Sequence, residues 1–170
     1  YSGRKLSLIL KKLDDESNSL VNLVYPINNV TSVEIRKSQN NFEVLENILQ
    51  LYKEEVVIKN IIKNNLYSSA VNSGIEPNII IEFARIFGFE VDFQRDIRQE
   101  DRFEILYERF VDDNNKVRDT GKIIYASMYV NGEEINLYNF NYKNEEDFYD
   151  INGKSITKAL MKTPINGARL

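Results

Sequence analysis

The stretch from residue 64 to residue 107 constrains the fold more than any other part of the sequence. Ile62, Leu66 and Ala70 lie four apart, so they share one helical face and predict a first short helix. Gly74 ends this helix, because glycine takes the left-handed conformation at no steric cost. Pro77 suits the first turn of a second helix, where the missing N–H of proline is not needed.

The second helix and an alternating segment complete this stretch. Gly88 closes a helix whose apolar residues recur at i, i+3, i+4 and i+7, namely Ile80, Phe83, Ala84 and Phe87. Beyond it, residues 89–94 alternate between apolar and polar, and residues 102–111 do the same, which is typical of strands. We therefore expect an α+β core in residues 60–110, with Phe83 and Phe87 buried against a sheet.

A hairpin follows near the C-terminus. Residues 123–130 are apolar on both faces and predict a central strand. Asn131-Gly132 is the strongest hairpin signal in the chain, because a type I′ turn needs positive φ at both positions. Residues 135–142 return from that turn as its antiparallel partner. The remaining polar segments are expected to be turns or loops, namely 112–116, the acidic 144–147 and Asn152-Gly153.

The N-terminal part is expected to be a separate small module, residues 1–59, ahead of an α+β domain, residues 60–170. Residues 3–13 carry apolar side chains on one helical face and basic ones opposite, and residues 17–25 repeat a short helical pattern that Pro26 ends. Three extended features are expected after them: a strand at 31–36, a loop at 38–41, and a hairpin of 48–52 with 56–62 around Lys53-Glu54-Glu55. The two helices resemble the middle of a LysM-like βααβ unit, which often binds glycan, but a plain packing module is the favoured reading.

Composition excludes several classes of protein. The 170 residues carry 26 acids and 22 bases, a net charge of −4, so no nucleic-acid partner is expected. Cysteine is absent, which rules out disulfides and thiolate metal sites. No apolar run reaches the roughly 18 residues of a membrane span.

Three separated blocks resemble the region just ahead of the catalytic domain in lysostaphin/LytM-type zinc metalloendopeptidases, which cut peptide cross-links in bacterial peptidoglycan. The blocks are LYSSAVNSGI, IIEFARIFGFEVDFQRDIRQEDRFEILYE and YDINGKSITKALMKTPINGARL. They occur in the family's order and cover roughly residues 60–170. One departure is visible, because Glu100 precedes Asp101 where the family usually has Gly-Asp.

The resemblance implies that the zinc chemistry lies elsewhere. LytM-type enzymes hold zinc with an H-x-x-x-D pair and an H-x-H motif, whereas this chain has no histidine. We expect no catalytic residue, metal ligand or cofactor in residues 1–170, and zinc in a catalytic domain beyond Leu170. The substrate-binding residues are left unassigned by the sequence.

Carboxylates are the remaining candidates for catalysis. A pair of acids can hydrolyse a glycoside at the right spacing, and four lie close in sequence: Asp92, Asp96, Glu100 and Asp101. Arginines lie between these acids in the sequence, which favours ion pairs with a structural role over catalysis. Asp101 is expected to stabilise a turn through its side chain. Asp112, Asp113 and Asn114 resemble the start of a calcium loop but lack its glycine and its final glutamate, so a surface turn is expected.

The tyrosines give two readings. Tyr125, Tyr129, Tyr138 and Tyr142 are expected on one face of the predicted hairpin, given its alternation. Such rings stack on sugars, but cross-strand tyrosines also stabilise any antiparallel sheet, and the structural reading is favoured.

Two functions stay open at this point. The first is a regulatory and scaffolding region that packs on the zinc peptidase domain of the same protein in the bacterial periplasm or envelope. The resemblance implies that such a region can cover the zinc cleft, and oxygen-bearing candidates for blocking it are Asp14, Asp15, Glu16 and the Asn40-Asn41 loop. The second is a free-standing envelope module that binds glycan or a protein partner. An open reading frame beyond Leu170 that reaches the zinc motifs would distinguish them.

Overall fold

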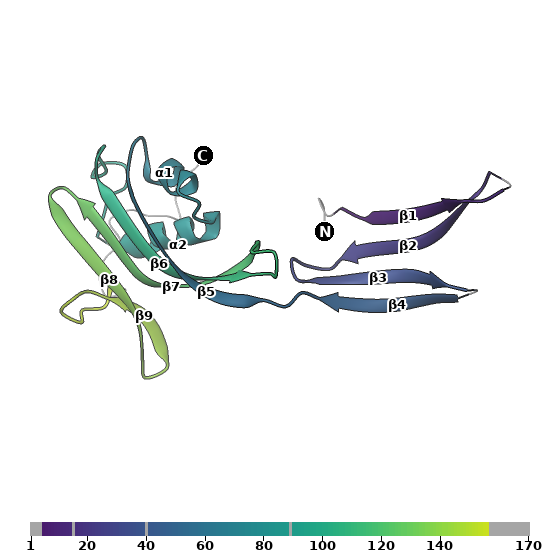
Figure 1. Cartoon of the computed structure of the whole chain (residues 1–170). Helices are drawn as coiled ribbons and strands as arrows, with labels where there is room; N and C mark the ends of the chain where they lie inside the picture. Colours follow the sequence, from purple (N-terminus) through teal and green to yellow (C-terminus); the bar gives the residue numbers. More distant parts are fainter. Residues whose placement is uncertain (1–4, 15, 40, 89, 157–170) are drawn as a thin grey trace. The chain divides into compact units, whose positions relative to one another are not determined.

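The protein's computed structural model describes residues 5–14, 16–39, 41–88 and 90–156. It divides into two compact units. Unit 1 comprises the residues up to Tyr52 together with Val111–Asp119, and unit 2 comprises Lys53–Phe110 together with the residues from Thr120 onward. Each unit is built on its own antiparallel sheet (Figure 1).

Unit 1 holds a four-stranded sheet whose strands follow in chain order. The strands are β1 (Ser7–Lys12), β2 (Asn18–Pro26), β3 (Thr31–Ser38) and β4 (Asn41–Ile48). Register places Leu8, Leu23, Ile35 and Val44 opposite one another in a single row across all four strands. Because side chains alternate between the two faces of a strand, this row lies on one face of the sheet.

The helices predicted at 3–13 and 17–25 are wrong, because the described residues of both segments form β1 and β2. The leucines of β1 fit a period of two as well as a helical period, and the valines of β2 favour a strand. Pairing with β3 then decides for the strand. The two helices of the LysM-like βααβ prediction are therefore not found there, whereas the strand and loop predicted at 31–41 correspond to β3 and the turn before β4.

Unit 2 holds a five-stranded sheet in the order β5-β6-β7-β8-β9 and two helices. The strands are β5 (Tyr52–Ile61), β6 (Arg102–Val111), β7 (Val117–Val130), β8 (Glu133–Tyr142) and β9 (Glu145–Tyr149). The helices, α1 (Leu66–Asn72) and α2 (Pro77–Phe87), lie against one face of this sheet (Figure 1). The predicted α+β class is thus confirmed.

Both predicted helices form, but α1 begins at Leu66, so Ile62 precedes the helix and is buried in the core without being part of it. Asn65 caps α1, and its side chain accepts a hydrogen bond from the Ser68 N–H at 2.7 Å. Gly74 follows α1 with φ of 83°, the left-handed conformation expected at that position. Pro77 begins α2 and Gly88 ends it.

The apolar core lies between the helices and the sheet. Phe83 and Phe87 have no exposed surface, and their ring centroids lie 4.6 Å apart. Phe83 also meets Phe103 of β6 edge to face, at 6.2 Å. This confirms the predicted burial of both helix residues, and the core extends beyond residue 110 to Met128, Leu137 and Phe148 among others.

The strand predicted at 89–94 is wrong, since the described residues from Glu90 to Asp96 form turns. Asp96 accepts a hydrogen bond from the Asp92 N–H at 2.8 Å, and Asp92 accepts one from the Gln94 N–H at 3.0 Å. Short acidic side chains stabilise such turns by satisfying local backbone donors. Phe93 still packs against the core, which explains why the alternation imitates a strand.

The hairpin predicted around Lys53-Glu54-Glu55 is also wrong, because β5 runs through these residues without a turn. The neighbouring strand β6 supplies opposite charges: Lys53 pairs with Glu108 at 2.5 Å, and Glu54 pairs with Arg109 at 2.9 Å. Charged residues that suggest a turn therefore lie on a strand, where cross-strand partners stabilise them.

The acidic loop predicted at 144–147 is strand β9, which pairs antiparallel with β8 from Tyr142↔Glu145 to Tyr138↔Tyr149. Lys143 and Asn144 make the tight connection, with φ of 53° and 66°. This two-residue turn with positive φ at both positions replaces the predicted longer loop.

The β7–β8 hairpin confirms the prediction at Asn131-Gly132, whose φ angles are 54° and 84°. Replacing Gly132 by Val is expected to destabilise the protein by about 1 kcal/mol or more, because a β-branched residue is strained at positive φ. A Cβ atom at Gly132 would meet no other atom within 4 Å, so the loss is a backbone effect. Chemical denaturation measures it, with Gly132→Asn as the control, since asparagine tolerates this conformation better. An unchanged midpoint in Gly132→Val would contradict the turn assignment.

Candidate functional site

The face of the five-stranded sheet opposite the helices carries the tyrosines selected from the sequence. Tyr125 pairs with Tyr138 in register, and alternation puts Tyr129 and Tyr142 on the same face. The buried Ala126, Met128, Val130 and Leu137 take the other parity and face the core. The prediction that the four tyrosines share one face is therefore confirmed.

Two of these tyrosines have structural partners. The Tyr125 hydroxyl donates a hydrogen bond to Asn136 Oδ1 at 2.6 Å, and burial raises the pKa of Tyr125 above its ordinary value. The guanidinium carbon of Arg102 lies 4.6 Å from the centroid of the Tyr129 ring, a cation–π contact. Tyr125 and Tyr129 thus stabilise the sheet, as the structural reading predicts.

The β8–β9 hairpin presents the exposed aromatic rings. One face of β8 carries three aromatic residues at every second position, namely Tyr138, Phe140 and Tyr142. Tyr149 of β9 lies directly across from Tyr138. With the segment from Asp150 to Ser155, they line an open groove of about 930 Å³. The four selected tyrosines did not include Phe140 and Tyr149, although Phe140 stands between two of them in the same alternating pattern.

The acidic cluster between Asp92 and Asp101 is structural. Asp101 is buried and accepts a hydrogen bond from the Arg98 N–H at 2.6 Å, which confirms that it fixes a turn. Asp92 lies 3.8 Å from Arg95, and Asp96 accepts a backbone hydrogen bond. Glu100 adopts φ of 73°, so it takes the left-handed conformation in place of the glycine usual in the family. The carboxylates of Asp92, Asp96 and Asp101 are engaged in turns, an arrangement unlike an acid–base pair.

The aspartate–asparagine segment after β6 is a tight turn as predicted. The Asp112 carboxylate accepts hydrogen bonds from the backbone of Asn114 and Lys116, at 2.9 and 3.0 Å, and forms an ion pair with Arg118 at 2.6 Å. The Lys116 N–H, then the Arg118 guanidinium, hold the pKa of Asp112 below its usual range. Arg118 is thus the cationic partner of this carboxylate.

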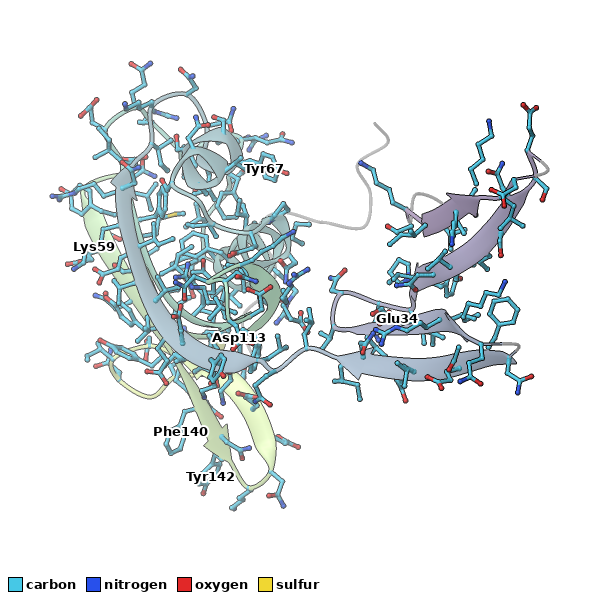
Figure 2. All side chains as sticks on the ribbon, turned by 45° about the vertical axis from the view of Figure 1, so that its right-hand side comes forward. Glu34, Lys59, Tyr67, Asp113, Phe140 and Tyr142 are labelled. Carbon is cyan, nitrogen blue, oxygen red and sulfur yellow. The ribbon has the colours of Figure 1, made fainter. Side chains whose placement is uncertain are left out.

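Unit 1 has a polar centre at Glu34 of β3 (Figure 2). Its carboxylate accepts hydrogen bonds from Arg36, Asn47 and Asn22, at 2.8, 3.1 and 2.8 Å. These bonds, led by the one from Arg36, lower the pKa of Glu34. The opposite face of the sheet carries the apolar row Leu8, Leu23, Ile35 and Val44, in which Val44 is 67% exposed and Leu8 52% exposed.

The oxygen-bearing candidates of unit 1 gather at one end of its sheet. Asp14 and Glu16 lie in the turn between β1 and β2, and Asn41 begins β4 after the turn from β3. In an antiparallel sheet that follows chain order, these two turns lie at the same end (Figure 1). Asp15 and Asn40 lie outside the described residues.

The described part of the chain shows neither a metal site nor a membrane helix. It contains no group of three or more acid side chains that could hold a metal ion. None of the helices in that part is long and apolar enough to cross a membrane. The C-terminal block MKTPINGARL of the resemblance lies outside the described residues.

Comparison with known families decides the relationship. The family model described as the Csd3 second domain matches residues 51–169. The chain belongs to this family. The match covers the three blocks that resemble the pre-catalytic region of LytM-type peptidases, so that resemblance is confirmed.

Two kinds of relatives agree with this assignment. The chain is 29% identical over 160 residues to peptidoglycan DD-endopeptidase ShyC of Vibrio cholerae, covering 92% of the chain but 35% of that protein. Among solved structures, a zinc-containing peptidase from Vibrio cholerae matches with a TM-score of 0.55 and 19% identity, over 89% of this chain and 44% of that one. Helicobacter pylori Csd3 in its hexagonal crystal matches with a TM-score of 0.53 and 15% identity, over 84% and 38%. The chain therefore spans less than half the length of these relatives.

Proposed function

We propose that this chain is the non-catalytic N-terminal regulatory and scaffolding region of a bacterial peptidoglycan metalloendopeptidase. The observation that carries the proposal is the family match over residues 51–169, together with longer relatives named as a peptidoglycan endopeptidase and a zinc-containing peptidase. The longer protein would act in the periplasm or cell envelope, where its substrate lies. Its zinc would be held by a separate peptidase domain, since residues 1–170 contain neither histidine nor cysteine.

The exposed apolar face of unit 1 supports a packing role. The sheet β1–β4 carries the row Leu8, Leu23, Ile35 and Val44 on that face, and Val44 is 67% exposed. A sheet with an apolar face gains stability when another layer covers it, and large exposed apolar patches mark interaction sites. We propose that the zinc peptidase domain of the same protein is that layer.

In this proposal, the side chains that block the zinc site come from the hairpin turns at one end of this sheet. A catalytic zinc keeps one position open for water, and an oxygen ligand can fill it. Asp14, Glu16 and Asn41 present such oxygens from the β1–β2 and β3–β4 turns. A chain connection between the two domains gives a high effective concentration, so a weak contact suffices to close the cleft most of the time.

A free-standing envelope module is the second candidate. The exposed rings Phe140 and Tyr142 favour it, because aromatic surface on a sheet is suited to a ligand or partner. The gene distinguishes the two functions: a reading frame that continues beyond Leu170 to the zinc motifs supports the regulatory role, and a stop codon there supports the module.

Truncation of the longer protein tests the regulatory role. Deleting residues 1–50 removes β1–β4 and leaves β5, which begins at Tyr52. We expect hydrolysis of cross-linked peptidoglycan to rise at least tenfold, since allosteric coupling of about 1–3 kcal/mol corresponds to roughly 5–150-fold. Asp14→Asn with Glu16→Gln in the intact protein is the milder variant, and Glu55→Gln, at an exposed acid of β5 in unit 2, is its control. Equal activity of the truncated and intact proteins would contradict occlusion.

A further inference from the structure

The groove on the β8–β9 hairpin is the feature of unit 2 that the regulatory role leaves unexplained. Its floor is the outer face of the hairpin, where Tyr138, Phe140 and Tyr142 of β8 lie opposite Tyr149, Asp147 and Glu145 of β9. Its wall is the segment from Asp150 to Ser155, which returns to bridge Tyr149. The volume of about 930 Å³ is enough for several sugar rings or a short peptide.

The rings in this groove are exposed yet held in place. Phe140 is 60% exposed and Tyr142 58%, and both stand on the hairpin away from the helices (Figure 2). Phe140 meets Tyr149 edge to face at 6.4 Å, and the Tyr138 ring lies 5.2 Å from that of Tyr125. The alternating rings of β8 are roughly 7 Å apart along the strand, since each residue rises about 3.4 Å. The hairpin thus offers a row of ordered aromatic faces.

Hydrogen-bond acceptors surround the rings. The Asp150 carboxylate accepts hydrogen bonds from the Asn152 and Lys154 N–H groups, at 2.9 and 2.8 Å, and these lower its pKa, so it is ionised at neutral pH. Asp147 accepts from the Phe148 N–H at 2.8 Å and from the Ser155 hydroxyl. Glu145 is an exposed acid at the rim, next to Tyr142 in register. The main cation is Lys143, whose ammonium lies 5.1 Å from the centroid of the Tyr142 ring.

We propose that this groove binds a neutral glycan strand, specifically the N-acetylated sugar backbone of peptidoglycan. A pyranose ring presents flat C–H faces to aromatic rings and hydroxyl and amide donors at its edges, which matches aromatic faces bordered by carboxylates. An acidic ligand is repelled by the three carboxylates of the groove, Glu145, Asp147 and Asp150. A purely apolar protein surface would take the exposed Glu145 carboxylate out of water without offering it a donor. The proposal rests on the proposed function, because it names the part of the substrate that this region would hold for the zinc domain.

Titration of residues 1–170 with a hexamer of N-acetylglucosamine tests the proposal, with NMR shifts or calorimetry as the readout. We expect binding, and at least a tenfold loss of affinity in Phe140→Ala with Tyr142→Ala. Tyr67→Ala is the matched control, since Tyr67 is 53% exposed on α1, far from this groove in sequence. Circular dichroism checks that the variants fold. Glu145→Gln is a second variant that leaves the rings in place, and its expected loss is severalfold.

Three outcomes would overturn the glycan site. They are no binding at millimolar hexamer, equal affinity of the ring variant and the Tyr67→Ala control, and tighter binding of an oligolysine peptide than of the sugar at the same residues. The assay contains no zinc domain, so its failure is independent of the regulatory role. Conversely, a truncation that leaves hydrolysis unchanged would remove the regulatory role without affecting sugar binding.

Discussion

Phe83→Ala is expected to destabilise unit 2 by about 3–5 kcal/mol, the usual loss for truncating a buried phenylalanine. The Phe83 ring has no exposed surface and contacts both Phe87 of its own helix and Phe103 of β6. Truncation would remove the contacts that the Phe83 ring makes with Phe87 and Phe103 and would leave a cavity, because the surrounding structure relaxes only in part. Denaturant unfolding followed by far-UV circular dichroism measures the loss.

Ile81→Ala is the matched control for this variant. Ile81 lies on the same helix but is 65% exposed, so its truncation removes little buried area. We expect its midpoint to stay close to that of the parent chain, since surface changes usually lie within about 0.5 kcal/mol. If Phe83→Ala costs no more than Ile81→Ala, the assignment of helix faces is incorrect.

Tyr107→Phe is expected to cost about 1–3 kcal/mol, because it leaves a carboxylate in the protein without its donor. The Tyr107 ring is fully buried, and its hydroxyl donates a hydrogen bond to Glu76 Oε2 at 2.7 Å. Glu76 is the residue that precedes α2, so this bond ties the start of the helix to β6. The substitution keeps the ring and removes only the hydroxyl, and Glu76→Gln is the control that keeps an acceptor oxygen. Equal stability of Tyr107→Phe and the parent chain would contradict the role of this bond.

The same tyrosine gives a pH dependence with a defined sign. Burial, and then the hydrogen bond to Glu76, raise the pKa of Tyr107 above its ordinary value of about 10. The stability due to this group is therefore fully present below about pH 10 and is lost as the pH rises further, because only the unfolded chain releases the proton there. The difference in unfolding free energy between the parent chain and Tyr107→Phe should shrink above that pH. A constant difference would contradict the raised pKa.

The elements of unit 2 that were predictable from sequence carry local signals. Gly74, Pro77 and Gly88 mark the ends of the helices, and Asn131-Gly132 marks the β7–β8 turn. At Gly74, Pro77 and Asn131-Gly132 the signal acts through the backbone conformation of the residue itself, so no knowledge of distant contacts is needed. Gly88 ends α2 with an ordinary helical φ of −61°. The burial of Phe83 was also predictable from the local sequence, because it follows from the helical spacing of the apolar residues.

The first two strands of unit 1, β1 and β2, were not predictable in this way. The leucines of β1 suit both a helical period and an alternating period, and only pairing with β2, as in Leu8↔Leu23, decides between them. Such pairing depends on residues far along the chain, and tertiary context then overrides local propensity. The hairpin turn predicted at Lys53 and Glu54 of β5 is wrong for the same reason, because Glu108 and Arg109 of β6 stabilise these charged residues on a strand.

The candidate site was predictable only in part. Alternation correctly placed Tyr138 and Tyr142 on one face of the sheet, together with Tyr125 and Tyr129. The groove itself depends on β9 and on the segment after it, and β9 was expected to be a loop because its acids hide its alternation. The side of the sheet on which Tyr149 lies therefore could not be predicted from the sequence.

Inhibition in trans tests the central claim most directly. Residues 1–170 would be added at rising concentration to the separately produced zinc peptidase domain, and hydrolysis of cross-linked peptidoglycan followed. The regulatory role predicts that hydrolysis falls as the added protein reaches micromolar concentration, and that Leu8→Asp with Val44→Asp, on the exposed apolar face of unit 1, weakens this inhibition. Hydrolysis that is unchanged at high micromolar concentration of residues 1–170 would contradict it.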